Sequence, residues 1–232
     1  DLDTVTVFDA VTRAKLAETA VGKGPRNIAI APDGRAWVTN IESSTISILN
    51  GTSYAVATTV PLPPGSRPFG LAFDPVGTAA FVALEGSGQL LKLNPTSGAQ
   101  ISSINVGQHA RHVSVNAGGT RVYVSRFITP TLPGENTLTP DTTGRGGEII
   151  VVTGGTLAVE RTILLQHSEK PDSPTAARGI PNYLGATALS PDGLSAWVPS
   201  KQDNIKRGTA RNGVGLNHDQ TLRAITSRID LG

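Results

Sequence analysis

A short phrase recurs four times in this chain of 232 residues. Each copy has a turn that contains glycine, then an aromatic residue that opens an alternating strand. The copies read Pro32-Asp33-Gly34 before Trp37-Val38-Thr39-Asn40, Asp74-Pro75-Val76-Gly77 before Phe81-Val82-Ala83-Leu84, Asn116-Ala117-Gly118-Gly119 before Tyr123-Val124-Ser125-Arg126, and Pro191-Asp192-Gly193 before Trp197-Val198-Pro199-Ser200. The first three aromatics are 44 and 42 residues apart. A period of this length, built from short strands and turns, predicts the blade of a β-propeller.

The second repeat shows how one blade divides into strands. We expect a short inner strand at 71–73, a second strand at 79–83, an alternating strand at 89–94 and a fourth strand at 99–106. Four antiparallel strands joined by short turns match one blade. The other repeats align with it. They predict full blades near 24–64, 67–107 and 110–166, two outer strands of another blade at 4–9 and 15–21, and three strands within 184–231.

The sequence therefore predicts an all-β fold, a single β-propeller domain or propeller fragment over residues 1–232. It holds about four to five blades of four antiparallel strands, as part of a seven- or eight-bladed ring. An open arc would expose two blade faces, so we expect flanking blades or self-association to complete the ring. The four aromatics of the phrase are expected in the core between blades.

Composition excludes several classes of function. The net charge of +2 is too small to indicate nucleic-acid binding. No apolar run approaches the ~18 residues of a membrane span. The chain has no cysteine, which excludes disulfides, thiol catalysis and cysteine-bound zinc. A chain without cysteine fits an exported protein, so we expect a periplasmic, extracellular or cell-surface location.

In these repeats the chain resembles the YVTN family of β-propeller repeats, whose phrase is a Pro-Asp-Gly turn, then Tyr-Val-Thr-Asn, then a strand that ends in Asp. The residues that match are Pro32-Asp33-Gly34 with Trp37-Val38-Thr39-Asn40, and the closing strand Thr4-Val5-Thr6-Val7-Phe8-Asp9. The resemblance implies a scaffold found in surface-layer proteins, in secreted or periplasmic proteins, and in long chains fused to a cytochrome c peroxidase-like haem domain. The haem-attachment motif Cys-X-X-Cys-His is absent, so we expect no cofactor on this chain.

Three segments depart from the repeat, at 127–147, 167–182 and 201–220. Functional side chains of repeat proteins usually lie in such loops. The last segment is rich in cations, which predicts a loop that docks an anion or a protein partner; the alternative is an ordinary solvated loop. The residues predicted for this partner-docking loop are Arg126, Lys201, Asn204, Lys206, Arg207, Arg211 and His218.

A second candidate site lies where the inner strands begin. Arg26, Asn27, Arg111 and His112 are expected to line the mouth of the central channel. Converging arginines could hold a carboxylate or phosphate in a fork geometry, and the alternative is that they bond backbone carbonyls at the blade corner. His109 lies three residues before His112, but no catalytic or metal-binding motif surrounds them. We therefore predict no catalytic and no metal-binding residue.

These observations favour a non-catalytic β-propeller scaffold that binds a protein partner or a small anionic ligand in an exported or cell-surface protein. One alternative is the propeller module of an exported haem-containing redox enzyme whose catalytic domain lies outside this chain. A third is a propeller lyase or hydrolase with its site at the channel mouth. The repeat alone does not choose among them, because a repeat scaffold supports many functions.

Overall fold

The computed structural model describes residues 2–134, 141–170, 178–204 and 222–232. Within these residues the chain forms only strands and turns, so the fold is all-β, as the sequence predicts. No helix in the described part is long and apolar enough to cross a membrane. The strands form one two-stranded sheet and four sheets of four strands.

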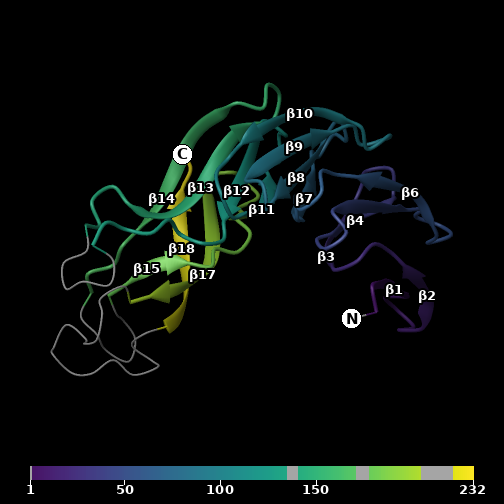
Figure 1. The fold of residues 1–232 in the computed structure, drawn as a ribbon, viewed down its shortest axis with the longest axis horizontal. Coiled ribbons are helices and arrows are strands. Elements are labelled where there is room, and N and C mark those ends of the chain that lie inside the picture. Colours follow the sequence, from purple (N-terminus) through teal and green to yellow (C-terminus); the bar gives the residue numbers. More distant parts are fainter. Residues whose placement is uncertain (1, 135–140, 171–177, 205–221) are drawn as a thin grey trace.

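The sheets follow one another along the chain (Figure 1). The N-terminal pair has β1 (Thr4–Phe8) and β2 (Lys15–Ala20). The first blade has β3 (Pro25–Ile30), β4 (Ala36–Asn40), β5 (Thr45–Leu49) and β6 (Val56–Pro61). The second blade has β7 (Pro68–Phe73), β8 (Ala80–Leu84), β9 (Gln89–Leu93) and β10 (Gln100–Asn105). The third blade has β11 (Ala110–Val115), β12 (Arg121–Arg126), β13 (Gly146–Thr153) and β14 (Val159–Gln166). The last blade has β15 (Ile180–Asn182), β16 (Ala188–Leu189), β17 (Ser195–Asp203) and β18 (Leu222–Asp230).

The first three blades are antiparallel meanders, in which strands that are consecutive in sequence pair with each other. The last blade differs, because β15 and β16 both pair with β17 and together take the position of a first strand. β18 pairs with the other edge of β17 and is the third strand. Residues 201–203, which the sequence assigned to an insertion, belong to β17 and are paired on both edges.

The blades form an open arc (Figure 1), with the first strands β3, β7 and β11 along its hollow and β6, β10 and β14 on the outside. This arrangement follows from the hydrophobic pattern. The second strands are buried on both faces, whereas the outer strands β6 and β10 consist of exposed and half-buried residues only. The hollow is therefore the side on which the beginnings of the inner strands meet.

A tight turn between the first and second strands explains the glycine of the recurring phrase. Gly34, Gly77, Gly119 and Gly193 have φ angles of 85°, 75°, 68° and 72°. This is the left-handed region that residues with a side chain rarely adopt. Each of these amides donates to the carbonyl three residues earlier, as Gly34 does to Ala31 at 2.8 Å. The phrase therefore marks a turn that recurs at the same place in all four blades.

The hydrophobic core lies between the blades. Trp37, Phe81 and Tyr123 are 0%, 1% and 3% exposed, and each packs in a cluster with residues of the following blade. Trp37 meets the ring of Phe73 edge-on, with the centroids 5.3 Å apart. Trp197, expected in the same kind of core, is 40% exposed. The expectation fails for Trp197 because no described blade follows the last one.

Candidate functional site

Two backbone positions in each blade bring side chains to the edge of the hollow; we call them the rim positions. The first lies directly before the first strand in three blades and between β15 and β16 in the last. It is left-handed, with φ angles of 67°, 52°, 60° and 52° at Gly24, Arg67, His109 and Tyr183. The second follows four residues after the aromatic of the phrase and holds Ile41, Glu85, Phe127 and Lys201. In three blades the second-position amide donates to the first-position carbonyl, at 2.8–3.0 Å. The backbone is thus repeated while the side chains differ.

Glu85 and Arg111 join the second and third blades at this edge. Arg111 Nε donates to Glu85 Oε1 at 2.7 Å, and Arg111 Nη2 donates to the same oxygen. The side chains of Glu85 and Arg111 are 8% and 20% exposed. Arg67 Nε lies 3.7 Å from the other oxygen, Glu85 Oε2, which is too far for a hydrogen bond. Oε2 is therefore a buried oxygen that accepts no hydrogen bond.

A cavity of about 480 Å³, here the mouth cavity, opens beside this pair. Its lining residues are Arg67, Glu85, Gly86, Gln108 and His109. The volume falls in the range of small-molecule sites. The Arg67 side chain is 51% exposed, and within the described part of the chain its guanidinium makes only the long contact to Glu85. The wall thus presents a guanidinium with unused donors beside a carboxylate that is largely buried.

A row of three aromatic rings and two cations runs from the edge beside the mouth cavity to the last blade. The guanidinium carbon of Arg111 lies 4.6 Å from the Phe69 centroid and 3.4 Å from the Phe127 centroid. Phe127 stacks on Tyr183, with the centroids 4.6 Å apart and the rings 14° from parallel. Lys201 Nζ lies 3.7 Å from the Tyr183 centroid. This rim ladder holds side chains of three blades together, and each cation–π contact contributes about 0.5–2 kcal/mol.

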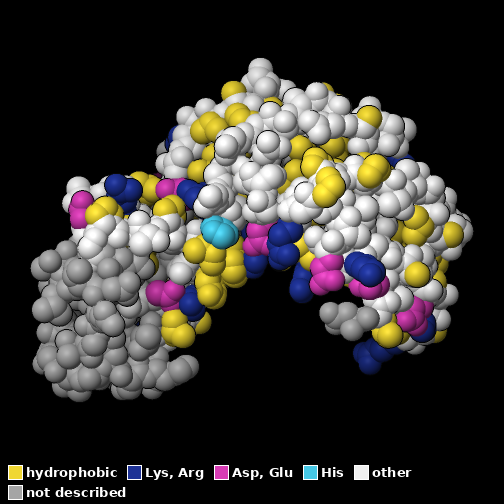
Figure 2. Space-filling model, viewed as in Figure 1, with side chains coloured by type: hydrophobic (Ala, Val, Ile, Leu, Met, Phe, Trp, Pro, Cys, Tyr) yellow, Lys and Arg dark blue, Asp and Glu magenta, His cyan; other side chains and the backbone are white. Residues whose placement is uncertain are grey.

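Charged side chains also lie along the hollow of the arc. Figure 2 shows acidic, basic and histidine side chains gathered over the middle of the arc, with hydrophobic side chains beside them. The rim ladder brings two cations and three aromatic rings to this edge, and Glu85 pairs with one of the cations. Opposite charges and apolar faces in one place suit a ligand that has both polar and apolar parts.

His112 lies next to the ladder and is half-buried. Its ring meets Phe69 edge-on at 5.3 Å. Burial lowers the pKa of His112 below its ordinary 6.5, the Arg111 charge lowers it further, and Glu85 opposes both. The imidazole is therefore neutral at pH 7. Among the described residues no carboxylate bonds to it, and no group of three or more potential metal ligands forms anywhere in that part of the chain.

The structure separates the four residues predicted at the channel mouth. Arg111 and His112 lie together at the rim, as described. Arg26 is exposed on β3, beside a smaller cavity of about 210 Å³. The backbone amide of Asn27 donates to Thr39 Oγ1 at 3.2 Å. No contact in the described residues joins this first-blade pair to Arg111.

The partner-docking residues also fall in different places. Arg126 ends β12, donates to the Gln108 carbonyl at 2.8 Å and pairs with Glu148. Lys201 lies on β17 in the rim ladder and pairs with Asp203 at 3.0 Å. Asn204 follows β17 and is half-buried. The other four predicted residues, Lys206, Arg207, Arg211 and His218, lie outside the described residues.

Sequence reasoning missed Arg67, Glu85, Phe127 and Tyr183 as rim residues. The signal that could have found them is their fixed distance from the aromatic of each phrase. At the second rim position the four blades carry isoleucine, glutamate, phenylalanine and lysine, a chemical variety that a purely structural position would not need. By sequence alone Glu85 is typical of an ordinary turn, because a serine and two glycines follow it.

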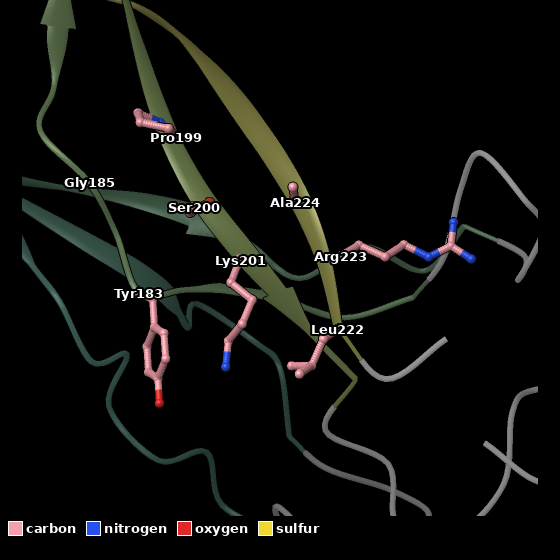
Figure 3. A pocket seen from close by; sticks show the side chains of 8 residues that line it. All are labelled: Tyr183, Gly185, Pro199, Ser200, Lys201, Leu222, Arg223 and Ala224. Atoms are coloured by element: carbon pink, nitrogen blue, oxygen red, sulfur yellow. The ribbon is translucent and has the colours of Figure 1, made fainter. Parts of the chain in front are cut away.

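Another cavity of about 450 Å³ lies on the outward face of the last blade (Figure 3). It is lined by Tyr183, Gly185, Pro199, Ser200, Lys201, Leu222, Arg223 and Ala224. In the close-up, Tyr183 and Lys201 lie side by side, while Arg223 extends in a different direction. Pro199 has the same blade position as Thr39, whose hydroxyl donates to the Phe69 carbonyl of the following blade at 2.7 Å. We therefore assign this cavity to the packing surface between blades and not to a ligand.

Comparison with known proteins supports the fold. No family model matches the sequence, and no curated protein matches it, so membership of the YVTN family stays a prediction. The chain is similar to hydrazine synthase of Kuenenia stuttgartiensis, with a TM-score of 0.76, 18% identity, and coverage of 99% of this chain and 57% of that one. It is also similar to a 6-phosphogluconolactonase-like protein of Bacteroides uniformis, with a TM-score of 0.59, 16% identity, and coverage of 90% and 64%. The chain thus spans less than two thirds of each, and likeness at this identity shows the fold alone, which is a propeller with four-stranded antiparallel blades.

Proposed function

We propose that this chain is a β-propeller module that binds a small ligand at the rim of its hollow and catalyses no reaction. The mouth cavity carries the proposal, because Arg67 on its wall is half-exposed and its guanidinium makes no hydrogen bond within the described residues. A guanidinium with free donors can hold the carboxylate or phosphate of a ligand through two parallel hydrogen bonds.

The neighbours of the cavity support binding in preference to catalysis. Arg111 is held by two aromatic rings and donates to Glu85, so it fixes the position of a residue that lines the cavity. His112 packs against Phe69 and has no described carboxylate to orient it as a general base. The Glu85 side of the cavity is therefore fixed before a ligand binds, which suits recognition.

The proposal includes an exported or cell-surface location. Its support is the absence of cysteine in 232 residues and the resemblance to repeats of surface and secreted proteins. A protein that leaves the reducing cytosol without cysteine avoids unwanted thiol oxidation. Fractionation of the source cells with an antibody against the chain would test the location, and a purely cytosolic signal would contradict it.

A thermal-shift screen tests the binding function. Small organic anions, inorganic phosphate, sugars and amino acids would be added singly to the full chain, and at least one should raise the melting temperature by mass action. The rise should vanish in Arg67→Met and persist in Lys15→Met. Lys15 is a matched control, because its side chain is also 51% exposed and lies on β2.

Two results would contradict the proposed function. One is a screen in which no compound stabilises the chain, or in which stabilisation survives in Arg67→Met. The other is chemical conversion of the bound compound, because a pure binding module leaves its ligand unchanged. Proton NMR over several hours, with the compound in excess over the chain, would detect such conversion.

A further inference from the structure

We infer that Asn50 is a site of spontaneous modification, at which the folded chain loses the side-chain amide and forms aspartate or isoaspartate. The inference is independent of the proposed ligand site, because Asn50 lies in the turn between β5 and β6 of the first blade. It follows from three features of this turn: a backbone amide that bonds to nothing, a side-chain carbonyl that two other amides polarise, and a glycine that the packing requires.

The turn between the third and fourth strands of a blade begins with a capping residue. Asp9, Asn50 and Asn94 hold this position, and Oδ1 of each accepts from the backbone amides two and three residues later. For Asn50 the donors are Thr52 at 2.8 Å and Ser53 at 2.9 Å. Among the described residues nothing accepts from Asn50 Nδ2, and the residue is exposed to water. The turn thus needs the oxygen of Asn50 and not its amide nitrogen.

Gly51 supplies the nucleophile. Its amide makes no hydrogen bond within the described residues, and the same turn position of the second blade holds Pro95, which has no amide hydrogen. The turn therefore does not depend on this N–H. The packing also requires glycine here, because a Cβ on Gly51 would lie 2.2 Å from the Gly34 carbonyl oxygen. A residue without a side chain hinders attack on the preceding side chain least, so the fold places an open nucleophile directly after Asn50.

The reaction needs no reagent except water. The Gly51 nitrogen bonds to Asn50 Cγ, the Cγ–Nδ2 bond breaks, and ammonia leaves with the proton of the Gly51 amide. Water then opens the succinimide ring, at Cγ to give aspartate or at the main-chain carbonyl carbon to give isoaspartate. The first step places negative charge on Oδ1, where the amides of Thr52 and Ser53 already donate. Backbone amides placed in this way stabilise an oxyanion, and the reacting atoms belong to adjacent residues.

The turn should accept one product and not the other. Aspartate fits, because Asp9 holds the same position in the N-terminal pair and accepts from Val11 and Thr12 at 2.9 Å and 2.6 Å. Isoaspartate adds a methylene carbon to the main chain just before Gly51, which already lies close to Gly34. The modification therefore either adds a negative charge to the turn or disrupts the packing of two turns of the first blade.

Peptide mass spectrometry of the full chain tests the site. After incubation in neutral buffer, deamidation should be found at Asn50. It should be at least about tenfold lower at Asn94, which makes the same two hydrogen bonds but precedes proline. Fragment spectra are needed to locate the change, because the sequence has another Asn-Gly pair at 212–213, outside the described residues.

Pro95→Gly is the matched variant, because it gives Asn94 a following backbone N–H in the same kind of turn. Deamidation at Asn94 should then rise at least about tenfold, toward the level of Asn50. Asn50→Asp should melt at the same temperature as the parent chain, since Asp9 shows that the turn accepts a carboxylate. A lower melting temperature would overturn the expectation that aspartate fits. If Pro95→Gly does not fold, the test stands on Asn50 and Asn94 of the parent chain.

Incubation of the same chain in urea gives the rate of the unfolded state. The inference is supported if Asn50 of the folded chain reacts at least as fast as in urea. It is overturned if Asn50 stays intact in the folded chain while it reacts in urea, because the turn then protects the residue. Equal modification of Asn50 and Asn94 in the parent chain also overturns it, because a proline nitrogen cannot close the ring.

Discussion

Arg111 contacts three other side chains where two blades meet. It donates to Glu85 and lies between Phe69 and Phe127, which come from different blades. A planar guanidinium can make all of these contacts at once, because its edge donates while its faces pack on rings. The same residue therefore fixes the acid of the mouth cavity and the first contact of the rim ladder.

Arg111→Ala is expected to lower the free energy of unfolding by about 2–3 kcal/mol, because it leaves the largely buried Glu85 without its partner. The double variant Arg111→Ala with Glu85→Gln should recover part of this loss, since no charge is then left unpaired. Urea unfolding measures both. Equal stability of the single and double variants would show that the pair is not coupled.

His112 should make the stability of the chain depend on pH. Burial lowers its pKa in the folded state below the unfolded value of 6.5, so the unfolded chain binds more protons between these two values. Stability should therefore rise with pH through this window, be complete above pH 6.5 and fall as the pH drops below it. Urea unfolding at about pH 5.5 and about pH 7.5 should give a smaller difference in His112→Gln than in the parent chain. An unchanged difference would exclude His112 as its source.

At the scale of the elements, neighbouring blades are tied together by cations that reach the next blade. Arg35 of the first blade donates to the two carbonyls at 95–96 in the second, at 2.7 Å and 2.9 Å. Lys92 of the second blade donates to both carbonyls at 154–155 in the third, at 2.8 Å each. In each case the acceptors lie in the turn between the third and fourth strands. These bonds fix the outer edges of the blades, while the aromatics pack nearer the middle.

Lys92→Met should therefore weaken the chain by about 1–2 kcal/mol, because it removes two charge-assisted hydrogen bonds and keeps the apolar stem. Lys15→Met, which loses only an exposed ion pair to Glu18, should change stability by less than about 0.5 kcal/mol. Urea unfolding compares the two. Equal effects would mean that the inter-blade bonds contribute no more than a surface pair.

At the scale of the whole molecule, the arc presents a blade face that no described residue covers. Trp197 stands where Trp37, Phe81 and Tyr123 are buried. Arg228 pairs with Trp197 across the sheet as Lys92 pairs with Phe81, and its guanidinium carbon lies 6.0 Å from the Trp197 ring. This face therefore repeats both the aromatic ring and the cation that elsewhere contact a following blade.

Iodide quenching of tryptophan fluorescence tests this open face, because the chain has two tryptophans. Trp197 at 40% exposure should be quenched, and Trp37 at 0% should be protected. Trp197→Phe should leave only protected emission and Trp37→Phe only quenchable emission. Protection of Trp197 that increases with protein concentration would contradict an open face in solution and show that a second copy covers it.

The blades were predictable from the sequence because each depends on local signals. The turn at Gly34 and the burial of Trp37 follow from a glycine, an aromatic and the spacing between them. The rim was less predictable, since Glu85 and Arg111 are 26 residues apart and meet only when two blades pack. Trp197 could not be told from Trp37 by pattern, because its exposure depends on what lies beyond its blade. The rim ladder likewise depends on how far successive blades rotate.

At the left-handed rim position the chain carries side chains at a cost in stability. Gly24 demonstrates that the backbone there works with no side chain, and glycine adopts this conformation without strain. Arg67, His109 and Tyr183 adopt it at a cost of about 1–2 kcal/mol each. Selection for stability alone would favour glycine at all three positions. The resulting propeller would be more stable but would have no side chain at these rim positions. Replacing one of these residues by glycine would therefore separate the strain of the backbone from the contacts of the side chain.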